Sequence, residues 1–194
     1  MYKRLFILFF NLISHPVQSW KEKAEEQDTN NENFYRSYLY PVVGTIALLS
    51  FIGIFFAGRA PNIEVKTIIE QALKAVLREA LAYFAGFYVA SCLLSLILSK
   101  YFACEPGKYV CERFTGYASA VVYAVAMVSA LFPFLVFIRY LFMLFAAYTV
   151  WQGAIHYLRI KAEYLTKFTI FASILIVLSP LLIQRLLLVM MPGL

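Results

Sequence analysis

The stretch IIEQALKAVLREALAYFAGFYVASCLLSLILS, Ile68 to Ser99, decides the fold class of this chain. Its second half, Ala80 to Ser99, is an almost uninterrupted apolar run of 20 residues, which is the length that an α-helix needs to cross a hydrocarbon core. One helix from Glu64 to Ser99 would be about 54 Å long at 1.5 Å per residue. A hydrocarbon core is only about 30 Å thick, so roughly half of such a helix would lie outside it.

The first half of this stretch carries four charged residues, and two interpretations of them are open. As the wet end of a long helix, they lie in the interface or in water, where Glu70 and Lys74 form an i, i+4 ion pair. As a charged pathway inside the membrane, they would be functional, because an ionisable group is costly in hydrocarbon. The first interpretation is the simpler one. The residues concerned are Glu70, Lys74, Arg78 and Glu79.

Composition and four further apolar runs predict an integral membrane protein. The chain has 194 residues, of which 62% are hydrophobic and only 14% are charged, against about 25% charged in a typical soluble domain. Continuous apolar runs favour helices over the alternating strands of a β-barrel. The predicted fold class is therefore all-α, a polytopic membrane bundle of five transmembrane helices. The predicted spans are Tyr38 to Ala57, Ala80 to Ser99, Phe114 to Phe134, Leu135 to Tyr157 and Phe168 to Met190.

The distribution of lysine and arginine predicts the orientation, because cytoplasmic segments are enriched in both. Of the 17 Lys and Arg residues, eleven fall on the side of the N-terminus and six on the other, which places the N-terminus in the cytoplasm and the C-terminus outside. Anionic lipid headgroups are the nearest partners for such cations, so the net charge of +6 requires no nucleic acid. The eleven are Lys3, Arg4, Lys21, Lys23, Arg36, Lys100, Lys108, Arg113, Arg159, Lys161 and Lys167.

Residues 1–37 form a predicted cytoplasmic N-terminal segment, and residues 38–194 form the predicted transmembrane domain. The N-terminal stretch MYKRLFILFFNLI, Met1 to Ile13, begins basic and continues apolar as a signal peptide does, but no small-x-small cleavage site follows it. A retained amphipathic helix at the inner leaflet is the better interpretation.

Three further polar residues are functional candidates. Arg139 lies near the outer end of the fourth span, where it either snorkels to the interface or faces a cavity and binds an anion. His156 and Glu163 are seven residues apart, so on one helix they would share a face with Arg159 between them. This arrangement suits a proton relay or an interfacial ion pair.

The sequence predicts no catalytic residue, no metal site and no cofactor. Cys104 and Cys111 share the loop CEPGKYVC, but a zinc site would need two further ligands, which only the distant His15 and His156 supply. Free thiols are expected in this predicted cytoplasmic loop. Cys92, within the second span, is expected to be a small buried hydrophobic residue.

Four short motifs carry a family resemblance. HPVQSWKEKAEEQ has a proline, a tryptophan four residues later and then acidic residues. YLYPVVGTIALLSFIG, GYASAVVYAVAMVSALFP and WQGAIHYLRIKA fall in the first span, the third span and the inner end of the fourth. Together they resemble the Yip-domain family of small integral membrane proteins, and bacterial members most closely. The residues that carry the resemblance are Pro16, Trp20, Pro41, Gly53, Tyr117, Gly153 and Lys161.

The resemblance implies five spans and a cytoplasmic N-terminus, and it implies no reaction. The chain departs from the family in two places. Val122 stands about where the third span often has a proline, which removes the residue that would kink the span. The Asp-Leu-Tyr-Gly-Pro type of signature of eukaryotic members is missing, which weakens any transfer of their binding to trafficking GTPases.

Two functions from different classes remain. The first is a non-enzymatic protein of a bacterial inner membrane that scaffolds protein partners or takes part in envelope organisation or trafficking. Its N-terminal segment and its two cytoplasmic loops would be the contact surfaces. The alternative is a channel or transporter for a small solute or ion, acting as a homo-oligomer and using Arg139, His156, Glu163 and the charged stripe. Neutral substitutions of Arg139 and Glu79 should abolish the flux of a transporter, whereas a scaffold should lose assembly or nothing.

Overall fold

The computed structural model describes residues 2–26, 34–57, 64–102, 106–132 and 136–190, and these residues form helices and no strand. The all-α prediction is therefore confirmed for this part of the chain. In chain order the elements are α1 (Tyr2–Ser14), α2 (Pro16–Glu25), the π-helical turn η1 (Tyr35–Leu39), α4 (Tyr40–Ala57), α5 (Val65–Tyr101), α6 (Lys108–Ala118), α7 (Ala120–Leu131), α8 (Val136–His156) and α9 (Ala162–Met190).

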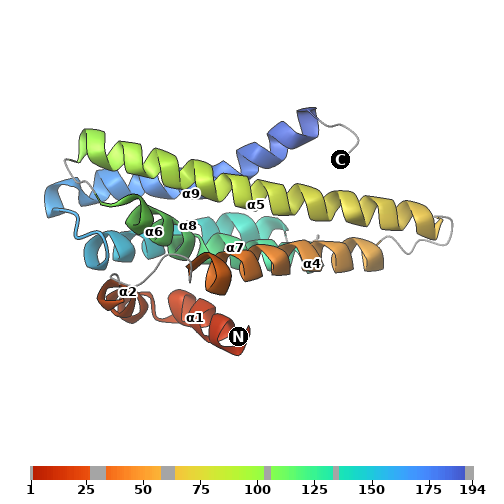
Figure 1. Ribbon diagram of the computed structural model, residues 1–194, viewed down its shortest axis with the longest axis horizontal. Helices are drawn as coiled ribbons and strands as arrows, with labels where there is room; N and C mark the ends of the chain where they lie inside the picture. The colour runs from red at the N-terminus through yellow and green to blue at the C-terminus, as the bar shows by residue number, and fades with distance from the viewer. Residues whose placement is uncertain (1, 27–33, 58–63, 103–105, 133–135, 191–194) are drawn as a thin grey trace.

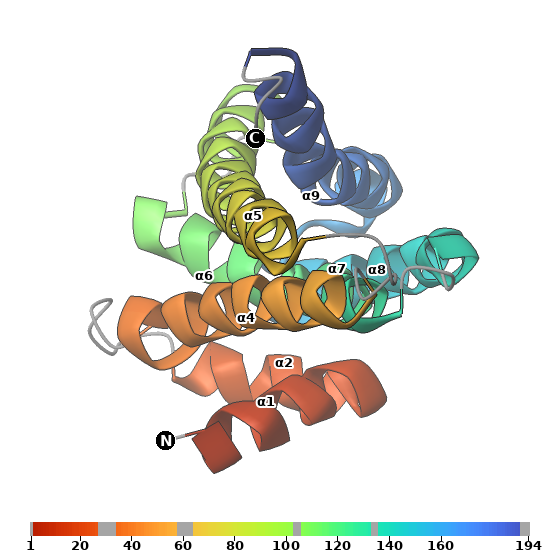
Figure 2. The ribbon, with the colours of Figure 1, turned by 90° about the vertical axis from the view of Figure 1, so that its right-hand side faces the viewer.

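The helices are stacked in three layers (Figures 1 and 2). α5 and α9 pack against each other in one outer layer, and α4, α7 and α8 make the middle layer. The N-terminal helices α1 and α2 lie on the opposite side, where α2 packs on α8 and α1 touches α7. The N-terminal segment is thus part of the packed structure.

Three helical segments are long and apolar enough to cross a membrane by length and composition: Tyr35–Phe56, Val65–Tyr101 and Ala162–Met190. The pair of α6 and α7 makes a fourth if it is one bent span. α8 (Val136–His156) lies within the predicted span Leu135 to Tyr157, and several of its side chains lie outside the described residues. The structure therefore supports a membrane protein with three to four candidate spans, and the count of five stays a prediction.

The long helix expected around the second span is present. α5 has 37 residues and is about 55 Å long at 1.5 Å per residue. It crosses α9 closely at Gly86, where an added Cβ would lie 2.8 Å from backbone atoms of Pro180. Pro180 lies inside α9, where a missing backbone N–H and the bulk of the ring bend a helix. The bend of α9 is visible in Figure 1.

The predicted third span is bent rather than straight. α6 and α7 meet at Ser119 with an angle of 42°, although Val122 replaces the proline that often stands in this span of the family. The Ser119 hydroxyl donates a hydrogen bond to the carbonyl of Thr115, at 2.7 Å. A serine that bonds back to the preceding turn is a known cause of helix bending. The bend therefore needs no proline.

The first span also starts differently from the prediction. Its helical structure begins at Tyr35 instead of Tyr38, with a π-helical turn in which the N–H of Tyr40 bonds to the carbonyl of Tyr35. This wider turn directly precedes Pro41, whose ring would clash with the carbonyl four residues back in a regular α-helix. Farther along, Gly53 of α4 touches the carbonyl oxygen of Ala130 in α7 so closely that a Cβ would overlap it.

Candidate functional site

The N-terminal segment docks on the bundle through Trp20 of α2. Trp20 is fully buried, with 0% of its surface exposed. The indole Nε1–H donates a hydrogen bond to the backbone carbonyl of Thr149 in α8, at 3.0 Å. That carbonyl lies one helical turn before Gly153, whose missing side chain leaves the space that the indole fills. A Cβ at Gly153 would lie 2.7 Å from two ring atoms of Trp20 and 2.8 Å from the ring of Phe114.

Aromatic rings from α6 and from the turn after α8 surround the indole. The ring centroid of Trp20 lies 5.4 Å from that of Phe114, 6.3 Å from that of Tyr117 and 5.5 Å from that of Tyr157. The contact with Tyr117 is edge-to-face. Aromatic pairs at these distances are worth about 0.5–1.5 kcal/mol each beyond the buried area. We call the cluster of Trp20, Phe114, Tyr117, Gly153 and Tyr157 the Trp20 junction.

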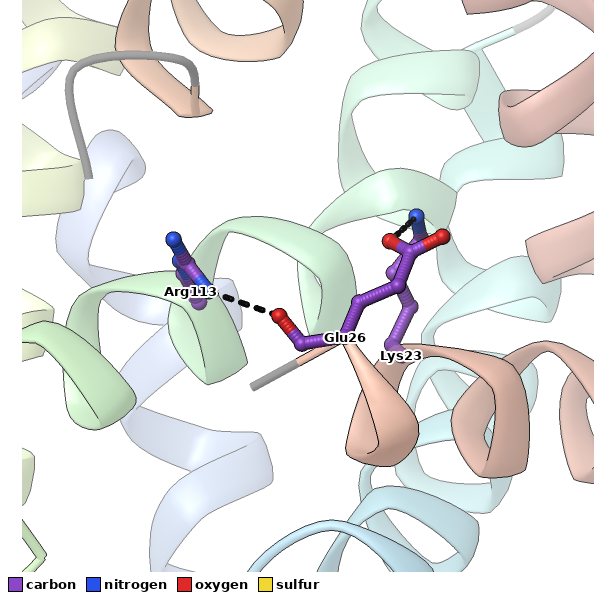
Figure 3. A network of polar contacts seen from close by, with 3 residues as sticks. All are labelled: Lys23, Glu26 and Arg113. Carbon is purple, nitrogen blue, oxygen red and sulfur yellow. Dashed lines mark hydrogen bonds and ion pairs between the residues drawn. The ribbon is translucent and has the colours of Figure 1, made fainter. Parts of the chain in front are cut away.

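A charged rim closes the junction beside the end of α2 (Figure 3). Lys23 and Glu26 form an ion pair at 2.5 Å, and the Lys23 ammonium lies 5.6 Å from the ring centroid of Tyr117. Arg113 of α6 donates a hydrogen bond to the backbone carbonyl of Glu26, at 3.4 Å. A cation near the C-terminal end of a helix stabilises the helix, because the last carbonyl groups there lack partners within the helix. α2 is thereby tied to α6 as well as to α8.

Two of the charged residues on α6 are buried, which is unusual for such side chains. Glu112 is 3% exposed and Arg113 is 9% exposed. The Glu112 carboxylate lies 3.9 Å from the Lys108 ammonium and also interacts with the hydroxyl of Tyr35. In the sequence, Arg113 counts only as one of the eleven charges that predict the topology. The structure instead makes it a helical residue that holds the N-terminal segment.

The structure brings three of the seven residues of the family resemblance together, namely Trp20, Tyr117 and Gly153. Pro16 is buried at the start of α2, where its missing N–H costs least. The other residues lie elsewhere. Pro41 follows the π-helical turn, Gly53 packs on α7, and Lys161 is exposed just before α9.

The charged stripe on α5 mostly agrees with the wet-end interpretation. Glu70 and Lys74 are exposed, but no ion pair joins them in the described residues, so that expected pair was wrong. Arg78 and Glu79 are half-buried, and their side chains lie 3.8 Å apart. Glu79 also accepts a hydrogen bond from the Gln184 amide of α9, at 2.6 Å. This contact joins two helices and explains the position of Glu79 without a conduction role.

The expected shared face of His156 and Glu163 was also wrong. α8 ends at His156 and α9 begins at Ala162. Between them, Arg159 has a φ of 52°, the left-handed conformation that ends a helix. His156 is half-buried and Glu163 is exposed on the next helix. For the third candidate, Arg139, the side chain lies outside the described residues.

The two cysteines that the structure describes, Cys92 and Cys111, are not part of a metal site. Among the described residues, no group of three or more His, Cys, Asp and Glu is placed to hold a metal ion. Cys111 is buried in α6, and Cys104 lies outside the described residues. Cys92 is exposed on α5, so the prediction of a buried residue was wrong. An exposed thiol on the apolar part of a candidate span is compatible with a surface that faces lipid.

The sequence singled out only part of this site. Trp20, Tyr117 and Gly153 came from the family resemblance, whereas Phe114, Thr149 and Tyr157 were missed. Phe114 and Tyr157 sit at predicted span ends, where aromatic residues are common as interfacial anchors. Thr149 takes part through its backbone carbonyl, which no side-chain pattern reveals.

The comparison with known proteins agrees with this picture. Neither the comparison with curated proteins nor the comparison with solved structures gave a match. The sequence matches the Yip1 domain over residues 10–191. The match includes α2 with Trp20 as well as the helices on which it docks, so it covers the junction and nearly all of the chain. The chain therefore belongs to the Yip1 domain family.

Proposed function

We propose that this Yip1-domain protein is a non-enzymatic scaffold in a bacterial inner membrane, which presents its N-terminal segment and cytoplasmic loops to protein partners. The observation that carries the proposal is the docking of α2. One side of α2 is fixed by Trp20 and by Arg113, while Gln18, Glu22 and Glu25 are exposed. A helix that is held rigidly on one face offers a preorganised surface on the other, which lowers the entropy cost of binding.

The proposal includes a topology. Five spans, a cytoplasmic N-terminus and an outside C-terminus follow from the five apolar runs and the excess of positive charge. The arrangement of the helices is compatible with this topology. The C-terminal end of α5, the start of α6 and the turn from α8 to α9 lie toward the same end of the molecule as α2 (Figure 1). Exposed basic residues at this end include Lys100, Lys108, Arg159, Lys161 and Lys167.

A transport function receives less support from the positions of the candidate residues. Glu70 and Lys74 are exposed near the start of α5, Glu163 is exposed at the start of α9, and His156 lies at the end of α8. These positions are distributed over both ends of the bundle and do not line one path. The Glu79 carboxylate accepts a hydrogen bond from the Gln184 amide, which is a structural contact between α5 and α9.

The experiment is photocrosslinking of the full-length protein in its own membrane. A photoreactive amino acid replaces Glu25 on the exposed side of α2, and the matched control replaces Lys66, which is exposed on α5. We expect an adduct with one reproducible protein partner from position 25 only. The Trp20→Ala variant should lose this adduct while remaining in the membrane, because α2 is then no longer held. Equal adducts from both positions, or none from position 25, would refute a contact surface on α2.

The same protein in liposomes tests the alternative. We expect Arg139→Gln and Glu79→Gln to leave the permeability of proteoliposomes to ions and small solutes at the level of empty liposomes, as with the unmodified protein. If the unmodified protein supports a flux and either variant abolishes it, the protein is a transporter and the scaffold proposal is refuted.

A further inference from the structure

A groove with a volume of about 450 Å³ lies between the end of α5 and the start of α9. It shares no lining residue with the Trp20 junction. The rings of Phe102 and Tyr164 meet beside it with their centroids 5.8 Å apart. The lining residues are Ile97, Tyr101, Phe102, Tyr164, Lys167 and Phe171.

The groove changes from polar to apolar along its length. α5 ends at Tyr101 and α9 begins at Ala162, and both helices continue from this end into candidate membrane spans. Lys167 and the tyrosines therefore lie nearer the rim. Ile97 and Phe171 are one helical turn deeper, since each is four residues from Tyr101 or Lys167 on the same helix. The polar rim of the groove matches the headgroup of a lipid molecule, and the apolar part matches an acyl chain.

The charge at the rim is positive. Lys167 is the charged residue in the lining and is exposed. Lys100 is also exposed, next to the groove, with its ammonium 5.7 Å from the ring centroid of Tyr101. Lysines at this level extend their ammonium groups to the headgroup region while their stems cover apolar surface. The lining residues include no acid.

We propose that this groove is a binding site for one anionic phospholipid. The phosphate is bound by Lys167, with Lys100 nearby, and one acyl chain lies along Ile97 and Phe171. A free phosphate would use only the rim and leave the apolar part empty. The acyl chain of a zwitterionic lipid fits the groove equally well. Its headgroup gains less binding free energy from the lysines, because it carries a compensating positive charge.

Native mass spectrometry of the full-length protein tests the proposal. The protein is delipidated in detergent and mixed with equal amounts of phosphatidylglycerol and phosphatidylethanolamine, and the bound lipids are counted. We expect one preferred phosphatidylglycerol. Lys167→Gln should weaken its binding about fivefold, the loss of one lysine contact near a membrane surface. The matched control Lys161→Gln, an exposed lysine outside the groove, should bind as the unmodified protein does.

Two further measurements separate a lipid from its headgroup. Ile97→Trp fills the apolar part, so it should lower the retention of both lipids while the far-UV circular dichroism and the elution volume stay unchanged. sn-Glycerol 3-phosphate should not displace the bound phosphatidylglycerol, because it lacks an acyl chain. The proposal is overturned if Lys167→Gln and Lys161→Gln retain phosphatidylglycerol equally, or if the soluble headgroup competes with it. Should Ile97→Trp fail to fold, the comparison of the two lysine variants still decides.

Discussion

The contact between Trp20 and Gly153 predicts that one added methyl group at position 153 will loosen the N-terminal segment. In Gly153→Ala the new Cβ would lie 2.7 Å from two ring atoms of Trp20 and 2.8 Å from a ring atom of Phe114, well inside the separation of about 3.5–4.0 Å at which carbon atoms attract each other. The indole is held by neighbouring rings and by its bond to Thr149, so it cannot turn aside without losing these contacts.

The expected loss of stability in Gly153→Ala is obtained by comparison with a second helical glycine, Gly44. Gly44 in α4 has no atom within 4 Å of an added Cβ, so Gly44→Ala gains only the helix propensity of alanine, about 1 kcal/mol. Gly153→Ala gains the same propensity inside α8 but is overpacked, which typically costs about 1–3 kcal/mol. The difference in stability between the two variants therefore isolates the overpacking and should be about 1–3 kcal/mol in favour of Gly44→Ala.

The assay uses the fluorescence of Trp20. The chain has only two tryptophans, so Trp151→Phe leaves Trp20 as the sole tryptophan, and its emission is excited at wavelengths that tyrosine does not absorb. We expect Gly153→Ala to shift its emission toward longer wavelengths and to lower the midpoint of thermal unfolding in detergent, and Gly44→Ala to do neither. The reasoning is refuted if the two alanine variants have the same emission maximum and the same midpoint.

Three more outcomes are expected. Gly53→Ala should lower the thermal midpoint more than the change at position 153, because its Cβ would meet the backbone carbonyl of Ala130, which cannot rotate away; a midpoint equal to that of the unmodified protein would contradict this close approach of α4 and α7. Glu79→Ala should destabilise the protein by about 1 kcal/mol in chemical unfolding by removing the acceptor of Gln184, whereas Glu70→Ala, at an exposed position, should have no measurable effect; equal effects would show that the bond contributes nothing. A tag at the C-terminus should react with membrane-impermeant reagents only from outside, and labelling from the cytoplasm would rule out the five-span topology.

The helical fold and the long α5 were predictable because they depend on the local sequence. A run of 20 apolar residues has one economical conformation in a membrane, and the charges before it continue the helix without a glycine or proline. The unbroken pattern from Glu64 to Ser99 therefore predicts a helix much longer than the apolar run, and α5 has 37 residues. The way in which neighbouring helices bend and cross is set by single contacts, which periodicity does not encode.

The bend between α6 and α7 and the end of α8 have this origin. At the bend, the Ser119 hydroxyl donates a hydrogen bond to the carbonyl of Thr115. Ser91 makes the same bond to Phe87 within the continuous helix α5, so a serine in the sequence does not mark a bend. The end of α8 has no glycine or proline between Ala154 and Glu163, so nothing in this segment marks the stop. Arg159 instead adopts the left-handed conformation, which costs a residue with a Cβ roughly 1–2 kcal/mol. Packing of α8 and α9 against each other offsets that cost.

Arg113 shows why the candidate site was harder to predict than the fold. The count of lysines and arginines treats each of them as a solvated charge that indicates the cytoplasmic side of the membrane. Arg113 adds one to that count whether it is solvated or buried. Its burial on α6 and its bond to the carbonyl of Glu26 depend on where α2 lies, which in turn depends on Trp20 finding the space at Gly153. The docking of α2 thus places a charge that already favours a cytoplasmic location against the end of the N-terminal helix. If this end of the bundle is cytoplasmic, the charge that sets the topology also holds the proposed contact surface in place.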